Sequence, residues 1–145
     1  MTERRWIIAS DHAGFALKKE IQKHFEDSGQ RYRDLGCHDE SSVDYPDFAH
    51  QVAQCIRESQ TEHALLICGT GTGMAMTANK HPHIRAAVCT DVYSAAMARR
   101  HNDANVLCLG ARVTGSGLAI AIVDAFASAH FEGGRHAKRV EKIDL

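Results

Sequence analysis

A cysteine that precedes three alternating glycines is the feature of this sequence best suited to chemistry. The glycine loop, defined here as residues 69–73, follows Cys68 at the end of a short apolar run. Glycines let the backbone turn tightly and present N–H groups to an anion, and the positive N-terminus of a following helix adds to this effect. Because a thiolate beside such groups is stabilised, Cys68 is positioned to act as a nucleophile or a base. Thr70 and Thr72 could bind a substrate hydroxyl or a developing oxyanion, although either could equally be a turn residue.

Other interpretations of these residues stay open. In the dinucleotide-binding motif the third glycine comes one residue later than Gly73 does here. Asp91, however, lies near the offset of about 20 residues expected for an acid that binds a ribose. A P-loop is disfavoured because its lysine and its longer spacing are missing. Most cysteines that end an apolar strand are simply buried, and Cys68 could be one of them.

Two further segments follow predicted strands. Asp11 and His12 come directly after the first one, where Asp11 could instead cap the next helix. Arg112 comes directly after the last one. Since ligands of parallel sheets bind beyond the carboxyl ends of the strands, all three residues are candidates for substrate contacts.

Basic residues elsewhere have both structural and functional interpretations. His101 and Asn102 end a predicted helix, where the helix dipole alone favours a histidine. Arg135 and Arg139 are four residues apart and therefore share one face of a helix. Two guanidinium groups on one face suit a phosphate dianion, although as an isolated feature this is more typical of a solvated basic face.

A metal centre fits the sequence poorly, although the chain has ten histidines. His81 and His83 form the only close histidine pair, and neither an HExxH motif nor a zinc-type cysteine spacing occurs. The GxSxG elbow of serine hydrolases is also missing.

Short apolar and amphipathic segments alternate along the chain. The predicted strands are 6–9, 31–35, 64–68, 84–89 and 106–109, and the predicted helices are 15–28, 46–58, 74–80, 92–100, 118–130 and 135–142. Gly29 is expected to cap the first helix. The alternation predicts an α/β protein with three layers, α/β/α, around a five-stranded parallel sheet joined by right-handed crossovers.

Length and composition predict one globular domain over residues 1–145. The net charge of −1 does not favour a nucleic-acid or membrane partner, so an anionic ligand needs a local cluster of donors. No stretch approaches the ~20 apolar residues of a membrane span, and the first residues do not resemble a signal peptide. Five cysteines without a CxxC pair predict reduced thiols, and we expect a cytoplasmic location.

Five motifs together resemble the ribose-5-phosphate isomerase B family, which includes galactose- and allose-6-phosphate isomerases. They are SDHAGF, VDYPDFA, ICGTGTGMAMTANK, RRHNDANVL and EGGRHAKRV, in the family's order and spacing over essentially the whole chain. The resemblance implies a Rossmann-like sheet and the interconversion of ribose 5-phosphate and ribulose 5-phosphate, a step of the pentose phosphate pathway, through a cis-enediolate. A hexose 6-phosphate isomerase with the same mechanism is the alternative, and a nucleotide-binding module without catalysis ranks below it.

The resemblance also implies roles for single residues. Cys68 matches the general base and His101 the acid that opens the sugar ring, and Thr70 is expected to assist catalysis beside the base. The matched substrate and phosphate contacts are Asp11, His12, Gly69, Gly71, Thr72, Gly73, Asn102, Arg112, Arg135 and Arg139. One branch of the family uses a glutamate just after the glycine loop as its base. Met74 occupies that position here, so the chain follows the cysteine branch.

The family is typically dimeric or tetrameric and needs no metal or organic cofactor. The order of the predicted elements gives a reason for two subunits, because Cys68 follows a strand while His101 precedes one. A helix of about ten residues separates those two edges by roughly 15 Å. We therefore expect a site shared between subunits, in which one supplies Cys68 and its partner supplies His101, Arg135 and Arg139. The C-terminal helix, at about 133–145, is then expected at the subunit interface.

Overall fold

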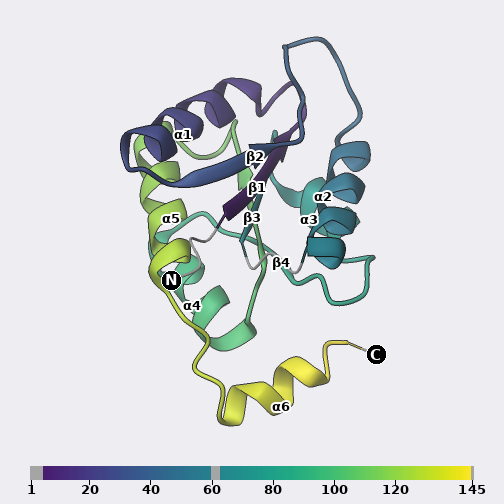
Figure 1. The fold of residues 1–145 in the computed structure, drawn as a ribbon, viewed down its shortest axis with the longest axis vertical. Coiled ribbons are helices and arrows are strands. Elements are labelled where there is room, and N and C mark those ends of the chain that lie inside the picture. Colours follow the sequence, from purple (N-terminus) through teal and green to yellow (C-terminus); the bar gives the residue numbers. More distant parts are fainter. Residues whose placement is uncertain (1–4, 60–62, 145) are drawn as a thin grey trace.

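Five parallel strands form one sheet, with helices on both of its faces (Figure 1). The computed structural model describes residues 5–59 and 63–144. The strands are β1 (Arg5–Ser10), β2 (Arg31–Asp34), β3 (Ala64–Cys68), β4 (Ala86–Val88) and β5 (Val106–Gly110). Their order across the sheet is β2-β1-β3-β5-β4, which places β3 at the centre.

Six helices connect and cover the strands. They are α1 (Phe15–Asp27), α2 (Tyr45–Ser59), α3 (Thr72–Ala78), α4 (Val92–Asn102), α5 (Ser116–Ser128) and α6 (Arg135–Glu141). Within the described ranges, none of these helices is long and apolar enough to cross a membrane. The predicted α/β fold with three layers and a five-stranded parallel sheet is confirmed.

Alternate residues of the central strand β3 face the two helical layers. Leu65 and Ile67 pack in the core formed with α1, α4 and α5, whereas Leu66 and Cys68 pack in the core formed with α2 and α3. All five residues of β3 are buried, which explains why this segment is continuously apolar instead of alternating. The Cys68 side chain therefore lies on the face of the sheet that α2 and α3 cover.

Helix α1 ends at the glycine that its sequence predicts as a cap. Gly29 adopts a left-handed conformation with φ of 73°, which glycine reaches without steric cost. Its N–H donates to the carbonyl oxygen of Glu26 at 3.3 Å, and the N–H of Gln30 donates to that of Phe25 at 2.8 Å. These two bonds form a Schellman motif, so the predicted glycine cap is confirmed.

Strand β4 is shorter than the predicted strand 84–89. The N–H of Arg85 donates to the side-chain oxygen of Asn105 at 2.8 Å instead of joining the ladder. An asparagine side chain thus takes the backbone donor just before the strand, and β4 begins at Ala86, which the apolar pattern alone does not show. The other strands and helices agree with the prediction to within a few residues at each end.

The parallel register gathers three strand ends at one edge of the sheet, which we call the carboxyl edge. Ser10 is paired with Ile67, and Cys68 is paired with Gly110, so the segments after β1, β3 and β5 emerge together. Helix α4 starts after β4 and returns to the opposite, amino edge, where β5 begins and where α6 packs against α4. Figure 1 shows α6 at the end of the molecule opposite the loop between β2 and α2.

Close packing at Gly14 gives a test of how the carboxyl edge is built. A Cβ atom at Gly14 would lie 2.5 Å from the carbonyl oxygen of Ile67, so the backbone would have to shift. We expect Gly14→Ala to lower the free energy of unfolding by about 1–3 kcal/mol. Gly117→Ala is the control, because no atom lies within 4 Å of its added Cβ and alanine favours a helix by up to about 1 kcal/mol. Urea unfolding of both variants measures this, and equal stability of the two would contradict the packing.

Candidate active site

Cys68 ends β3 at the carboxyl edge, with its sulfur directed at the glycine loop. The residue is only 4% exposed, and the N–H of Gly71 donates to its Sγ at 3.1 Å. Gly71 has φ of 82°, and a Cβ there would lie 3.0 Å from the backbone carbon of Leu109. Glycine is therefore required for the turn that brings an N–H group to the sulfur. The sulfur of Cys68 thus has a polar backbone donor beside it at the carboxyl edge.

The rest of the glycine loop turns sharply into α3. The N–H of Thr72, the first residue of that helix, donates to the Oγ1 of Thr70 at 3.3 Å, so Thr70 serves as a turn residue in this conformation. Helix α3 has only seven residues, so single N–H groups contribute more to the site than a helix dipole does. Met74 is fully buried in the core, so no side chain capable of acting as a base stands at that position.

Two long side chains flank the glycine loop. A Cβ at Gly69 would lie 3.2 Å from Nη1 of Arg112, and one at Gly73 would lie 2.5 Å from Cε2 of Tyr45. The guanidinium group and the phenol ring therefore rest directly against the loop. Arg112 is a predicted contact, whereas Tyr45 was not assigned as a site residue and was considered only as the end of a segment, residues 37–45, that could set the pocket length. The signal for Tyr45 was available, since it precedes a proline at the start of a helix that follows a strand of the same sheet.

Asp11 and His12 also lie at the carboxyl edge. Asp11 is 6% exposed, and its Oδ1 accepts the N–H of Gly14 at 3.1 Å within the turn that precedes α1. The N-cap of α1 is Gly14 and no side chain among the described residues caps the helix, so the alternative that Asp11 caps it is wrong. The Nδ1 of His12 accepts the N–H of Val43 at 3.1 Å. The neutral His12 ring therefore carries its proton on Nε2, which can donate to a ligand.

Other cysteines near Cys68 have the properties of inert thiols. Burial, assisted by the nearby charge of Asp91, raises the pKa of Cys89 to about 11. Burial also raises the pKa of Cys108 well above its usual range, and the neighbouring Cys68 and Cys89 raise it further. Asp91 itself accepts the N–H of Ser94 at 2.6 Å as the N-cap of α4, which accounts for it without a ribose.

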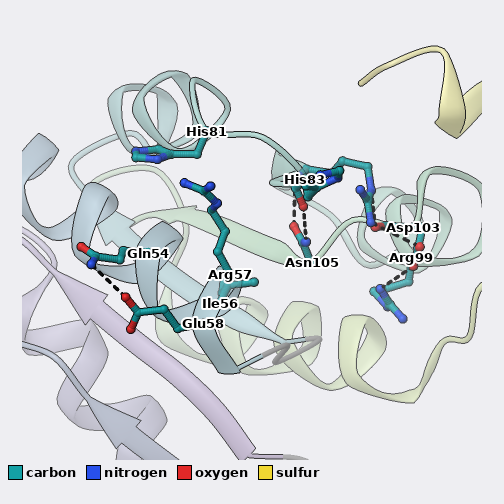
Figure 2. A pocket seen from close by; sticks show the side chains of 10 residues that line it. Gln54, Ile56, Arg57, Glu58, His81, His83, Arg99, Asp103 and Asn105 are labelled. Atoms are coloured by element: carbon teal, nitrogen blue, oxygen red, sulfur yellow. Dashed lines mark hydrogen bonds and ion pairs between the residues drawn. The ribbon is translucent and has the colours of Figure 1, made fainter. Parts of the chain in front are cut away.

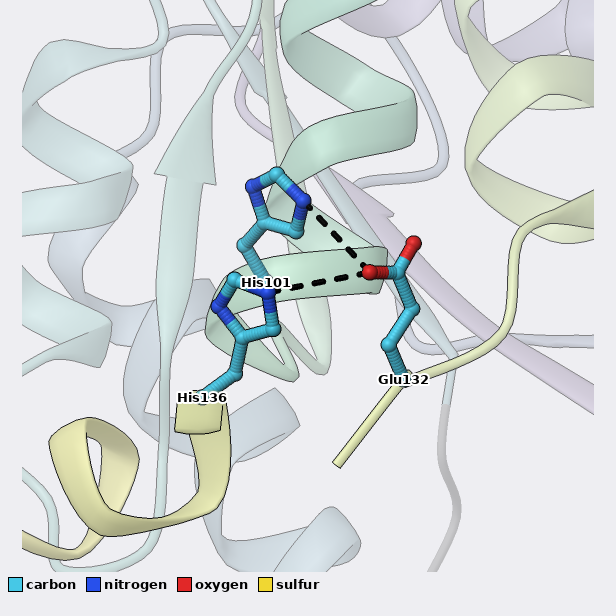
Figure 3. Close-up of side chains that lie close together, drawn as sticks. All are labelled: His101, Glu132 and His136. Atoms are coloured by element: carbon cyan, nitrogen blue, oxygen red, sulfur yellow. Dashed lines mark ion pairs between the residues drawn. The ribbon is translucent and has the colours of Figure 1, made fainter. Parts of the chain in front are cut away.

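A second group of predicted residues lies at the amino edge. His101 is in the last turn of α4, and its ring stacks on that of His136 with centroids 4.2 Å apart (Figure 3). The Nε2 atoms of His101 and His136 lie 3.7 Å and 3.6 Å from the same oxygen, Oε1 of Glu132. Burial, together with the nearby His101 and Arg135, lowers the pKa of His136. Glu132 and His136 had no predicted role, although their spacing of four residues is a recognisable pattern for a carboxylate–imidazole pair.

The remaining predicted residues belong to this second group. Arg135 begins α6 and Arg139 follows one turn later, and both are exposed. Asn102 is the last residue of α4 and is exposed as well. Helix α4 has eleven residues and so spans about 16 Å between the two edges. The described chain thus brings its predicted site residues together in two groups and does not join Cys68 with His101.

A separate cavity of about 830 Å³ lies at the amino edge (Figure 2). None of the predicted site residues lines it; its lining residues are Gln54, Ile56, Arg57, Glu58, His81, His83, Arg85, Arg99, Asp103 and Asn105. Arg85 and Arg99 form ion pairs with Asp103 at 3.3 Å and 3.2 Å. These pairs fasten the end of α4 to the segment before β4, which is a structural role.

Comparison with known proteins gives consistent matches along the chain. The family model described as Ribose/Galactose Isomerase matches residues 7–143. Ribose-5-phosphate isomerase B of Escherichia coli is 48% identical over 140 residues, covering 97% of this chain and 94% of the relative.

Solved structures agree over the same length. The structure of a ribose 5-phosphate isomerase from Thermotoga maritima has a TM-score of 0.95 and 45% identity, covering 97% of both chains. That of ribose-5-phosphate isomerase B from Mycoplasma genitalium with bound ribulose-5-phosphate has a TM-score of 0.92 and 43% identity, covering 99% of this chain and 95% of that one. The chain therefore belongs to the ribose/galactose isomerase family and is an enzyme of the isomerase class.

Proposed function

We propose that this enzyme interconverts ribose 5-phosphate and ribulose 5-phosphate, with Cys68 as the general base. The observation that supports this best is the bond from the Gly71 N–H to the Cys68 sulfur at the carboxyl edge, because it holds the sulfur at the glycine loop, where a parallel sheet binds its ligand. The names of the relatives above and the ribulose-5-phosphate bound to one of them support the choice of sugar.

The chemistry needs one base and a set of hydrogen-bond donors. The Cys68 thiolate removes the proton from C2 of the open-chain aldose and returns a proton to C1, so the intermediate is a cis-enediolate. A well-placed base accelerates such a step by about 10²–10⁴. The oxygen that gains charge needs preorganised donors, each contributing on the order of 10²–10³. The hydroxyl of Thr70 and the N–H of Gly73, in the first turn of α3, are our candidates.

The site is completed by a second copy of the chain. Ribose 5-phosphate is a closed ring until an acid–base group opens it, and His101 takes this role in our proposal. His101 lies at the amino edge, about 16 Å of helix away from the edge that holds Cys68. In a homodimer the amino edge of one subunit can face the carboxyl edge of the other, with α6 at the interface. A tetramer built from two such dimers keeps the same shared site.

The phosphate group is bound by arginines in the same arrangement. Arg135 and Arg139 are exposed on α6, next to the His101–His136 stack, so they reach the partner's site together with His101. The contacts to the rest of the sugar come from Asp11, His12, Gly69, Gly71, Thr72, Gly73, Asn102 and Arg112.

A hexose 6-phosphate is the second candidate substrate, because the matching family model also covers galactose isomerases. The mechanism is unchanged for a sugar that is one carbon longer. The loop before α2, which ends at Tyr45 beside the glycine loop, is placed to limit the length of the sugar. A panel of pentose and hexose phosphates in the assay below decides between the two.

Deuterium exchange tests the function and the base together. In D₂O the wild-type enzyme should convert ribose 5-phosphate to ribulose 5-phosphate and introduce deuterium at the reacting carbons, which NMR detects. We expect Cys68→Ala to lower turnover by about 10²–10⁴ while substrate binding persists. Cys89→Ala is the control, since its buried thiol has a raised pKa, and it should stay within a few-fold of the wild type. Near-normal turnover in Cys68→Ala would reject Cys68 as the base.

Subunit mixing tests the shared site. When Cys68→Ala and His101→Ala chains are unfolded and refolded together, about half of the dimers are mixed and one of their two sites is intact, so activity should return to about a quarter of the wild type. Mixing Cys68→Ala with Thr70→Ala is the control, because both changes affect the same half of each site and no activity should return. A lack of recovery in the first mixture, after subunit exchange is shown by mass spectrometry, contradicts the shared site.

The phosphate contact has its own test. Arg139→Ala removes a charged hydrogen bond of about 1.5–3 kcal/mol, so KM should rise roughly tenfold to a hundredfold with a smaller change in kcat. Lys138→Ala removes the same charge from an exposed neighbour on α6 that points in a different direction, and it serves as the control. Steady-state kinetics measure both, and equal KM values in the two variants would argue against a phosphate contact by Arg139.

A further inference from the structure

His101, Glu132 and His136 form a cluster at the amino edge whose composition suits a metal ion. One ligand atom from each residue lies within 4.8 Å of those from the other two. The residues come from the end of α4, from the segment before α6 and from α6, and they point toward one another (Figure 3). The end of α4 and the segment 132–136, which are far apart in the sequence, thus supply three donors to one small volume.

Contacts with Arg100 hold the Glu132 side chain of this cluster in place. The N–H of Glu132 donates to the carbonyl oxygen of Arg100 at 3.0 Å, and Arg100 Nε lies 3.4 Å from Glu132 Oε2. These contacts leave Oε1 directed at the two imidazole rings. The side chain of His136 is 9% exposed, whereas those of His101 and Glu132 are 37% and 45% exposed. The group therefore has one anchored ligand and two that solvent, and hence an ion, can reach.

We propose that this cluster binds a divalent transition-metal ion of the zinc type. Two histidines and one glutamate, with water in the fourth position, are a known ligand set for zinc, whereas magnesium and calcium prefer oxygen ligands alone. Tetrahedral bonds of about 2.0–2.2 Å place ligand atoms roughly 3.3–3.6 Å apart. The two imidazole–carboxylate distances, 3.6 Å and 3.7 Å, are already close to that value.

Binding requires one local movement. The two imidazole rings are stacked with only 9° between their planes, so their nitrogen lone pairs lie in two nearly parallel planes and do not converge on one point. Rotation of the more exposed ring, that of His101, directs its lone pair to the ion while His136 stays in place.

Metal binding would also regulate the enzyme, and this part rests on the proposed function. A histidine nitrogen that is bound to zinc has no lone pair with which to exchange a proton. An ion in the cluster therefore removes His101 from ring opening and inhibits the isomerase. Since His101 would serve the partner's site, one ion is expected to inactivate one site.

Metal titration tests the site without relying on activity. Co²⁺ is added to chelator-treated protein, and its visible absorption together with isothermal titration with ZnCl₂ reports binding. We expect one ion per chain, and a Kd at least about tenfold weaker in His136→Gln and in Glu132→Gln. His81→Gln is the control, because His81 and His50 form a separate pair with ring nitrogens 2.7 Å apart. Unchanged binding in His136→Gln, or its loss in His81→Gln, overturns the proposal.

Inhibition is measured separately, with ribose 5-phosphate as substrate. Zn²⁺ should inhibit the wild type at concentrations near its measured Kd, and the inhibition constant of His136→Gln should be raised in the same proportion. Equal inhibition of both proteins would place the inhibitory ion elsewhere, at Cys68 for example, and would reject the regulatory role. If the protein binds Zn²⁺ as expected but turns over no sugar phosphate, the proposed function fails and the metal site stands.

Discussion

The direction of the central strand determines where each functional group of this enzyme lies. Strand β3 is parallel to both of its neighbours and buried on both faces, so its side chains are committed to the core until the strand ends at Cys68. Every helix must return the chain to the opposite edge before the next parallel strand can begin. Residues after strands and residues before strands are therefore separated by the length of a helix. The division between Cys68 and His101 follows from this constraint.

The same constraint distinguishes one cysteine from the others. Cys108 is paired with Leu66 inside the sheet and is fully buried, so burial raises its pKa and disfavours the thiolate. Cys68 is two residues nearer the carboxyl edge and receives the N–H of Gly71. A shift of two residues along a strand thus separates a cysteine inside the sheet from one whose sulfur receives a backbone N–H at the carboxyl edge. Flanking side chains, Arg112 and Tyr45, are brought to the glycine loop because their segments end at the same edge.

At the amino edge, α6 combines two properties in a short segment. Its exposed arginines suit a phosphate, while His136 turns inward to stack on His101 and share Glu132 with it. The imidazole that we assign to ring opening is thereby held by an acid and a second imidazole. The same contacts that hold its orientation form the ligand set of our proposed metal site. Proton transfer and metal binding would compete for one nitrogen lone pair.

The sequence by itself determined the order and type of the elements, because they follow from local signals. These signals are the apolar runs of the strands, the amphipathic periods of the helices and the glycine cap at Gly29. It also determined that Cys68 and His101 lie at opposite edges of the sheet. In a parallel sheet, residues that follow a strand lie at one edge and residues that precede a strand lie at the other. Only the tertiary structure decided the late start of β4 beside Asn105, the contact of Tyr45 with Gly73, and the stacking of His101 on His136. Each of these joins segments that are distant along the chain. Their contacts depend on side-chain packing, which no local periodicity encodes.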